Sequence, residues 1–404
     1  MNLKLTPAPL SGVVNAIDSK SELHRILICS ALSNNPCKII TSVKPDNLSN
    51  DVKTTIDCLS ALGAVFEFGD REIDVKPIKD IAKDPVLDCR ESGSTLRFLL
   101  PVATALCDKV TFKGNERLSE RPIGSLKTAM EAHGVKFSGD VLPFTTKGKL
   151  TPGQFEITGD LTSQYLSGLL LALPLLNDMS TIRLTTPLLS RGYAELTIKT
   201  LADFGIAIME PIDQTFSVYR TEKRYISPRE IKVEGDWSNA AFFFVANYLG
   251  NDIDIENLNF HSLQRDKEIL NYLSGDIEEI DLTNTPDLLP ALSVVVAYGN
   301  VKTTFKGAAR LRLKESDRLM SVCEMIKALG GKAEDTDDGL IVYPQPLTGG
   351  TVESYGDHRI VMAATIASTR CEEPVIINEA RAVNKSYPTF FDDIKSLGGV
   401  IDVI

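Results

Sequence analysis

One recurring pattern constrains the fold of this chain more than any other feature: an apolar helix end, a glycine, then alternating apolar residues. The glycines stand at positions 63, 134, 205, 275, 330 and 398, and the copy around Gly275 is degenerate. Glycine suits the left-handed C-cap of a helix, and the subsequent period of two suits a β-strand. The pattern therefore predicts six helix–strand units.

The spacing of these glycines indicates how the units are grouped. The intervals are about 70 residues, apart from a shorter one between Gly275 and Gly330. This period exceeds the ~20–50 residues of the usual solenoid repeats. A chain of 404 residues is long enough for two cores, so we expect three compact units in each of two domains. A domain boundary is predicted near residues 233–236, where no low-complexity linker occurs.

The composition limits the partners and the compartment. With 43 Lys and Arg against 54 Asp and Glu, the net charge is −11, which disfavours nucleic acid or an anionic membrane as the main partner. The longest apolar stretch, residues 165–176, is shorter than the ~20 residues that span a bilayer. Residues 1–11 show no signal-peptide pattern, and the seven cysteines form no CxxC pair. We expect a cytoplasmic protein with reduced thiols.

Polar segments stand where several apolar helices are predicted to begin, at residues 19–21, 91–97 and 162–164. Each offers hydroxyl groups, unpaired backbone N–H groups and the positive end of a helix dipole, which together favour an anion. Ordinary N-capping is the alternative for any single segment. Pro122 is expected among the first residues of a helix that continues through Leu126 and Met130.

A second set of segments is charged and covers residues 313–318, 357–359 and 384–388. Lys314 and Arg318 are four residues apart, which predicts that they share one helix face. Solvated surface charge explains a single pair, but recurrence in different repeats favours one common site. No P-loop, GxGxxG or GxSxG motif occurs, and the histidines lack metal-ligand spacing. His24 is expected to be a helix-face residue beside Arg25.

Taken in order, these segments resemble the motif series of the 5-enolpyruvylshikimate-3-phosphate synthase family, from about residue 4 to the C-terminus. The matching motifs are Ser19-Lys20-Ser21 with Arg25, Gly93-Ser94 with Arg97, Glu120–Gly124, Ser163-Gln164, Ser190–Tyr193, Pro286-Asp287, Lys314–Arg318, Asp357–Arg359 and Lys385. The resemblance implies an α/β, two-domain enolpyruvyl transferase fold, similar to an inside-out α/β barrel, with three βαβαββ units per domain. It implies one domain of residues 1–19 and 235–404, another of residues 20–234, and an active site in the cleft between them.

The resemblance also implies an activity: transfer of the enolpyruvyl group of phosphoenolpyruvate to the 5-hydroxyl of shikimate 3-phosphate, with release of phosphate. This step serves chorismate and aromatic amino-acid biosynthesis, and in the family it needs no metal or cofactor. We expect a monomer. The residues implied for shikimate 3-phosphate are Lys20, Ser21, Arg25, Thr162, Ser163, Gln164, Ser190, Tyr193, Asp287 and Lys314. Those implied for phosphoenolpyruvate are Lys20, Gly93, Arg121, Gln164, Arg318, Arg359 and Lys385.

By the same resemblance, Asp287 is the base toward the 5-hydroxyl, Glu315 acts at the methylene carbon, and Lys20 donates a proton near the phosphate. Gly93 lacks a Cβ, so glyphosate is expected to compete with phosphoenolpyruvate. One alternative is the sister transferase that acts on UDP-N-acetylglucosamine, which usually carries a reactive cysteine near the equivalent of Arg121. Residues 118–126 contain no cysteine. A non-catalytic repeat scaffold is the other alternative.

Overall fold

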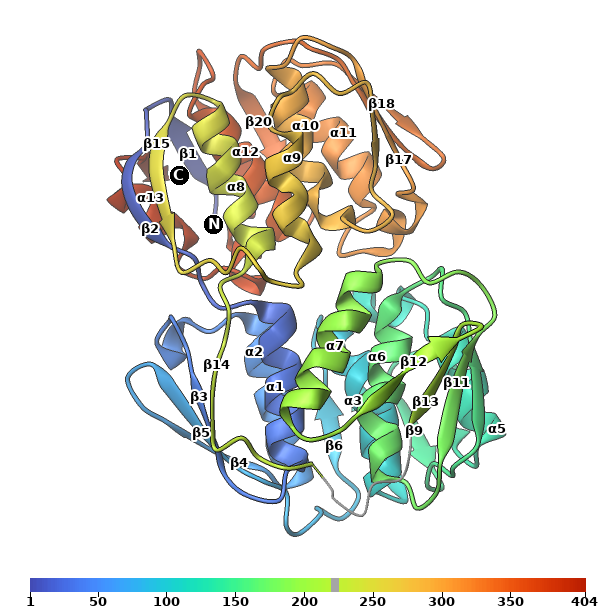
Figure 1. The fold of residues 1–404 in the computed structure, drawn as a ribbon. Coiled ribbons are helices and arrows are strands. Elements are labelled where there is room, and N and C mark those ends of the chain that lie inside the picture. Colours follow the sequence, from blue (N-terminus) through green and yellow to red (C-terminus); the bar gives the residue numbers. More distant parts are fainter. Residues whose placement is uncertain (219–224) are drawn as a thin grey trace. The chain divides into compact units, whose positions relative to one another are not determined.

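The computed structural model describes residues 1–218 and 225–404. The chain divides into two compact units (Figure 1). The continuous unit comprises Ser19–Val233, and the split unit combines Met1–Asp18 with Glu234–Ile404. Both ends of the chain therefore belong to the split unit.

Four-stranded sheets of one design recur in the described residues of the continuous unit. In each sheet the first two strands are parallel and the remaining pairs are antiparallel. The strand orders are β14 (Glu230–Lys232), β3 (Cys37–Ile40), β5 (Glu72–Lys76), β4 (Val65–Phe68); β6 (Val86–Asp88), β7 (Lys109–Lys113), β9 (Phe144–Lys147), β8 (Lys136–Phe137); and β10 (Gln154–Ile157), β11 (Ser180–Leu184), β13 (Thr215–Val218), β12 (Ile208–Ile212).

Helices connect these strands, because a parallel pair needs a long crossover. They are α1 (Lys20–Leu32), η1 (Pro45–Asn47), α2 (Asn50–Leu62), α3 (Gly93–Leu106), α4 (Glu116–Glu120), α5 (Gly124–Ala132), α6 (Ser163–Ala172), η2 (Leu173–Leu175) and α7 (Arg191–Asp203). Helix α6 approaches α3 closely at Gly168, where an added Cβ would lie 2.2 Å from the Arg97 carbonyl oxygen. A larger residue at position 168 would therefore separate the two helices.

The split unit repeats the sheet design twice and contains a two-stranded sheet besides. The strand orders are β16 (Glu279–Asp281), β17 (Thr303–Lys306), β19 (Gly339–Val342), β18 (Ala333–Thr336); β20 (Gly350–Glu353), β21 (Val375–Asn378), β1 (Leu3–Thr6), β22 (Val400–Val403); and the parallel pair β15 (Asp252–Glu256), β2 (Ser11–Asn15). The helices are α8 (Trp237–Tyr248), η3 (Arg265–Glu268), α9 (Ile269–Tyr272), η4 (Pro286–Leu288), α10 (Leu289–Ala297), η5 (Ala309–Leu313), α11 (Arg318–Ala328), α12 (His358–Ser368), η6 (Ala380–Lys385) and α13 (Phe390–Ser396).

The structure confirms the left-handed glycines of the repeat. The φ angles at positions 63, 134, 205, 275, 330 and 398 are all positive, between 69° and 116°. The copy at Gly275 differs from the others because the strand after it, β16, begins the neighbouring sheet. Among the described residues, the sheet of β15 and β2 has no terminal hairpin. Loss of that hairpin explains the short interval between Gly275 and Gly330.

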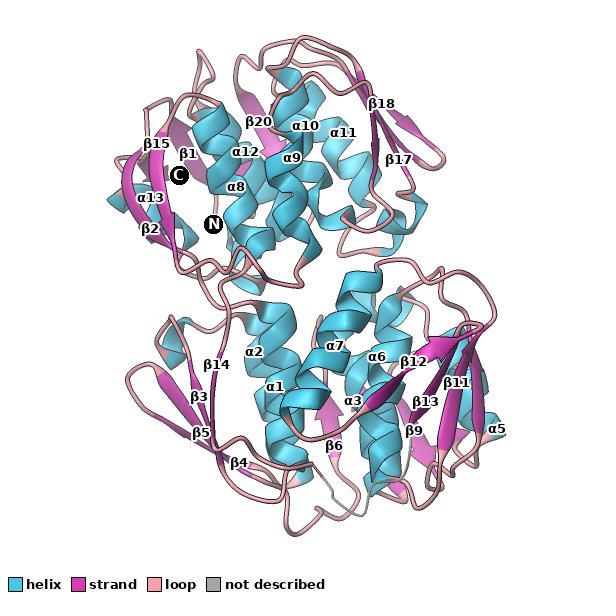
Figure 2. Ribbon diagram, viewed as in Figure 1, coloured by secondary structure: helices cyan, strands magenta, loops and turns pink. Residues whose placement is uncertain are grey.

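Within each unit the buried helices lie between the sheets, whereas α5 and α13 lie at the outer edges of their units (Figure 2). In the split unit, α10 and α12 are buried along their whole lengths, in keeping with their apolar composition. Among the residues described, no helix has the length and apolar character needed to cross a bilayer. The α/β fold of repeated units agrees with the prediction from the glycine pattern.

Candidate active site

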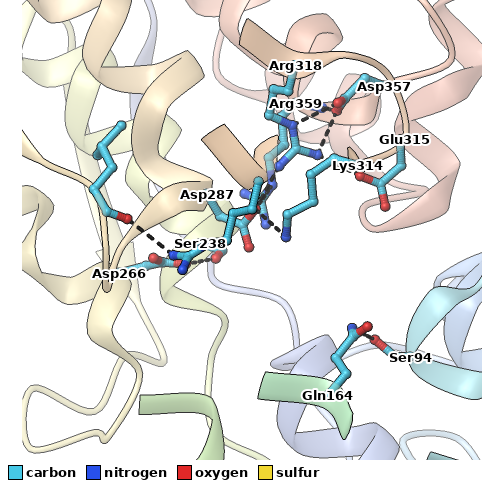
Figure 3. Close-up of polar contacts among 12 residues, drawn as sticks. Ser94, Gln164, Ser238, Asp266, Asp287, Lys314, Glu315, Arg318, Asp357 and Arg359 are labelled. Atoms are coloured by element: carbon cyan, nitrogen blue, oxygen red, sulfur yellow. Dashed lines mark hydrogen bonds and ion pairs between the residues drawn. The ribbon is translucent and has the colours of Figure 1, made fainter. Parts of the chain in front are cut away.

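A buried carboxylate in the split unit, Asp287 of η4, is surrounded by cations. Its Oδ1 lies 2.7 Å from Arg318 Nη1, 3.5 Å from Arg359 Nε and 3.6 Å from Lys314 Nζ. Figure 3 shows these side chains directed toward Asp287. Burial alone would raise the pKa of Asp287, but Arg359, Lys314 and Arg318 outweigh it and hold the pKa well below its usual range. Asp287 is therefore ionised.

Arg318 is fixed by further carboxylates. Its Nε lies 2.8 Å from Asp357 Oδ2, and its Nη2 lies 2.8 Å from Glu315 Oε2. Burial acts to lower the pKa of Arg318, but Asp357, Glu315 and Asp287 raise it above the ordinary value. The site thus alternates negative and positive groups, which reduces the cost of burying each charge.

The prediction that Lys314 and Arg318 share a helix face is wrong. Helix α11 begins at Arg318, and Asp317 is its N-cap, accepting a hydrogen bond from the Met320 N–H at 3.1 Å. Arg312 pairs with Asp317 at 2.9 Å and so anchors the turn. Lys314 follows η5 in an extended conformation, and Lys314 and Arg318 both contact Asp287.

Another buried carboxyl group, Asp266 of η3, was not predicted. It accepts a hydrogen bond from the Ser238 hydroxyl. Burial and the nearby Asp287 and Asp236 carboxylates raise the pKa of Asp266 to about 8, although Arg359 and Lys314 act in the opposite direction. Paired carboxyl groups whose pKa values move apart are typical of catalytic sites. No sequence pattern distinguishes Asp266 from other acidic residues in short polar segments.

Lys385 ends η6 and is buried. The η6 segment packs against α12, the helix whose second residue is Arg359. Asp357 is the N-cap of α12 and accepts a hydrogen bond from the Arg359 N–H at 3.0 Å. The predicted residues of the split unit thus come from neighbouring helix starts and turns.

In the continuous unit, the turn at Gly93 forms a second group of predicted residues. A Cβ added at Gly93 would lie 2.9 Å from Arg121 Nη1 and 2.8 Å from Arg97 Nη1. Gln164 at the start of α6 accepts a hydrogen bond from Arg97 at 2.8 Å and donates one to Ser94 at 2.9 Å. The structure therefore brings Gly93, Arg121 and Gln164 together, and it adds Arg97 and Ser94.

Pro122 departs from its predicted place in a helix. Helix α4 ends at Glu120, Arg121 is its C-cap and α5 begins only at Gly124. The Pro122 carbonyl oxygen accepts hydrogen bonds from Tyr165 Oη at 2.6 Å and Arg97 Nη2 at 3.1 Å. These contacts hold Pro122 in a turn beside the Gly93 group.

Arg25 joins a third group of predicted residues in the continuous unit. Its guanidinium donates to Ser21 O at 2.6 Å, Thr197 Oγ1 at 2.7 Å and Tyr193 O at 2.9 Å. It also lies over the Phe98 ring, 4.8 Å from the centroid. Burial lowers the pKa of Arg25 to about 10, although Tyr193 acts against the shift, so the group stays charged at neutral pH.

The other predicted residues of the continuous unit lie at the starts of helices. Lys20 begins α1 and pairs with Asp51 at 2.9 Å. Thr162 is the N-cap of α6, and Ser163 is the first residue of that helix. Ser190 is the N-cap of α7 and has a left-handed backbone with φ of 54°. Left-handed residues other than glycine cost about 1–3 kcal/mol and concentrate at functional sites.

A metal ion in a protein is usually held by a cluster of His, Cys, Asp and Glu side chains. No group of three or more His, Cys, Asp and Glu side chains in residues 1–218 and 225–404 is suited to hold one. All seven cysteines are buried free thiols. The predicted residues thus fall into groups by unit, with Asp287, Lys314, Glu315, Arg318, Arg359 and Lys385 in the split unit and the remainder in the continuous unit.

Solved structures show which class of fold this chain has. The EPSP synthase of Acinetobacter baumannii superposes with a TM-score of 0.81 at 21% identity, covering 99% of each chain. The enolpyruvyl transferase NikO from Streptomyces tendae gives a TM-score of 0.75 at 17% identity, covering 99% of this chain and 98% of its own. The fold is that of the enolpyruvyl transferases.

Sequence relatives identify the family within this class. The profile of the EPSP synthase (3-phosphoshikimate 1-carboxyvinyltransferase) family matches residues 5–278 and 272–394. The 3-phosphoshikimate 1-carboxyvinyltransferase of Clostridium acetobutylicum is 39% identical over 98% of this chain and 97% of its own length. The 3-phosphoshikimate 1-carboxyvinyltransferase of Clostridium novyi is 37% identical over 99% of this chain and 98% of its own length. The chain belongs to the EPSP synthase family.

Proposed function

We propose that this chain transfers the enolpyruvyl group of phosphoenolpyruvate to the 5-hydroxyl of shikimate 3-phosphate and releases phosphate. The observation that carries the proposal is the ionised Asp287, held among Arg318, Arg359 and Lys314, in a chain of the EPSP synthase family. Both substrates carry a phosphate and a carboxylate. Arginine forks suit such groups because they bind them through two parallel hydrogen bonds.

Substrate binding is assigned to residues from both units. The proposed phosphoenolpyruvate residues are Lys20, Gly93, Arg121, Gln164, Arg318, Arg359 and Lys385. The proposed shikimate 3-phosphate residues are Lys20, Ser21, Arg25, Thr162, Ser163, Gln164, Ser190, Tyr193, Asp287 and Lys314. Support comes from the helix starts that carry Lys20, Gly93 and Ser163, since the first backbone N–H groups of a helix favour anions.

The proposed reaction has two steps. The 5-hydroxyl oxygen bonds to C2 of phosphoenolpyruvate and loses its proton, while C3 gains a proton to become a methyl group. The tetrahedral intermediate then loses phosphate from C2 and a proton from the methyl group, which restores the double bond. Asp287 is assigned to the hydroxyl proton, Glu315 to the proton at C3 and Lys20 to the phosphate oxygens.

The electrostatics of Asp287 support this assignment. A carboxylate among cations is ionised and accepts a hydrogen bond, but it is a weak base. When Arg318 and Arg359 pair instead with an anionic substrate, less positive charge acts on Asp287, and its pKa rises. Substrate binding would therefore make Asp287 a stronger base at the moment the reaction requires one.

A phosphate-release assay tests the proposal. We expect phosphate from phosphoenolpyruvate when shikimate 3-phosphate is present, and none with UDP-N-acetylglucosamine as the acceptor. Release with the sugar nucleotide alone would assign the chain to the sister activity. Release with neither acceptor would contradict an enolpyruvyl transferase function.

We also assign the protein to the cytoplasm and expect it to be a monomer. Seven buried free thiols suit a reducing compartment. Light scattering would test the oligomeric state, with a mass of 44.2 kDa expected for the monomer. Fractionation of cells that express a tagged chain would test the location.

A further inference from the structure

A chain of buried hydrogen bonds runs across three helices of the continuous unit. His24 Nδ1 of α1 lies 2.7 Å from Thr55 Oγ1 of α2, which lies 2.6 Å from Thr95 Oγ1 of α3. Thr95 Oγ1 donates to Ser92 Oγ, the N-cap of α3, at 2.7 Å. His24, Thr55, Thr95 and Ser92 are all fully buried. His24 therefore lies on the buried face of α1, as its position beside Arg25 in that helix allows.

The number of available protons fixes which group donates in each of these hydrogen bonds. A hydroxyl group has one proton to donate. Because Thr95 donates to Ser92, the Thr55 hydroxyl must donate to Thr95. Thr55 then has no proton left for His24, so His24 must carry its proton on Nδ1 and donate it to Thr55. Each donor points toward the start of α3, and bonds aligned in this way strengthen one another.

The chain ends where α3 meets the guanidinium groups. Ser92 Oγ also accepts a hydrogen bond from the Thr95 N–H at 3.3 Å, which completes the cap of α3. Gly93, the next residue, is packed so closely that an added Cβ would lie 2.9 Å from Arg121 Nη1. The His24 ring also meets the Phe98 ring of α3 edge-on, with centroids 6.4 Å apart. His24 thus contacts α3 directly and through the hydroxyl groups.

We propose that His24, as the Nδ1–H tautomer, is a positioning residue that sets the Gly93 turn against Arg121 for phosphoenolpyruvate binding. This inference rests on the proposed function, in which Gly93 and Arg121 contact phosphoenolpyruvate. His24 itself touches no substrate. Its effect passes through Thr55, Thr95 and Ser92, so its loss alters the affinity for phosphoenolpyruvate more than the affinity for shikimate 3-phosphate.

Steady-state kinetics of variants at the hydrogen-bonded residues test this positioning role. His24→Leu and Thr55→Val should each raise the KM for phosphoenolpyruvate roughly 5- to 10-fold, the effect of one lost buried hydrogen bond. The KM for shikimate 3-phosphate and kcat should change less than about 2-fold. His24→Asn should restore most of the affinity, because its amide N–H can replace Nδ1–H. Thr54→Val is the matched control, since Thr54 is a buried neighbour on α2 whose hydroxyl donates within its own helix to Asn50 O, at 2.8 Å.

Nitrogen NMR of the native protein supplies a readout that does not depend on activity. Long-range proton–nitrogen spectra should show His24 with a protonated Nδ1, assigned by the signal that disappears in His24→Asn. A protonated Nε2 with a bare Nδ1 would overturn the proposal, as would equal rises in both KM values. Absence of phosphate release by the native protein would instead contradict the proposed function, whatever tautomer His24 adopts.

Discussion

Arg318 and Asp287 form an ion pair at 2.7 Å in the buried part of the split unit, and each has further partners of opposite charge. Arg318 retains Asp357 and Glu315 if Asp287 is replaced, whereas Asp287 is the acceptor assigned to the substrate hydroxyl. A replacement of Asp287 therefore tests its role in the reaction separately from its role as a partner of Arg318. Replacing the carboxylate should remove catalysis without leaving Arg318 unpaired.

Asp287→Asn should lower kcat by about 10²–10⁴-fold, the usual contribution of a general base. Calorimetric affinity for shikimate 3-phosphate should change much less, because the carboxylate acts mainly in the transition state. Asp287 is not the N-cap of α10, because Leu288 occupies that position. Asp252→Asn, at an exposed position, is the control. Near-normal kcat with a large fall in Tm would contradict the assignment.

Arg121→Ala and Lys385→Ala test the assignment of phosphoenolpyruvate residues to both units. Each should lower kcat/KM for phosphoenolpyruvate roughly 10–150-fold, the effect of losing a charge-assisted contact of about 1.5–3 kcal/mol. Binding of shikimate 3-phosphate alone should remain within about 2-fold by calorimetry. Arg117→Ala and Lys395→Ala, both at the protein surface, are the matched controls. Loss of shikimate 3-phosphate binding in Arg121→Ala would refute the separation of the two substrate sites.

Asp266 should make the protein less stable as the pH rises. Its folded pKa is about 8, whereas an aspartate in an unfolded chain has a pKa of about 3.9. Between these values the folded state binds one more proton than the unfolded state, so the free energy of unfolding falls with increasing pH. Asp266→Asn removes this dependence.

Thermal melts from pH 5 to pH 8 measure the effect at Asp266. The Tm of Asp266→Asn relative to the native protein should rise steadily across this range. Asp254→Asn, at an exposed position on β15, should show a constant difference. A constant difference for Asp266→Asn as well would mean that the Asp266 carboxyl is ionised in the folded protein throughout this range.

The sequence predicted features that depend on local chemistry. The six glycines have the expected left-handed conformations because a helix C-cap requires them whatever packs around it. The segments around Ser92, Thr162 and Asp357 do begin helices, since side-chain capping is decided within a few residues.

Features that depend on distant partners could not be predicted. Lys314 and Arg318 were expected on one helix because of their spacing. However, Asp317, which pairs with Arg312, is the N-cap, so the helix begins only at Arg318. Asp266 gains its raised pKa only from burial near Asp287 and Asp236. His24 meets Thr55, and Thr55 meets Thr95, across helices that are separated by many residues in the sequence.

Gly93→Ala should weaken glyphosate more than phosphoenolpyruvate. The added methyl group would lie 2.8 Å from Arg97 Nη1 and 2.9 Å from Arg121 Nη1, so a side chain must shift. A shift of Arg97 would break its bonds to Gln164 Oε1 at 2.8 Å and Pro122 O at 3.1 Å, and a shift of Arg121 would move a residue assigned to phosphoenolpyruvate. Phosphoenolpyruvate and glyphosate should both bind more weakly, because both are assigned to Arg121. Glyphosate should lose more affinity, because it is longer and the added methyl group narrows the site.

Inhibition kinetics separate the displacement of Arg121 from the loss of space beside Gly93. Overpacking costs about 1–3 kcal/mol, so the inhibition constant of glyphosate should rise roughly 5–150-fold, while the KM for phosphoenolpyruvate rises only several-fold. Gly124→Ala is the matched control, because it also places a methyl group at the start of a helix, and no atom lies within 4 Å of it. If glyphosate competes with phosphoenolpyruvate equally well in the native protein and in Gly93→Ala, the space at Gly93 does not govern its binding. An equal loss for both anions would show that displacement of Arg121 is the whole effect.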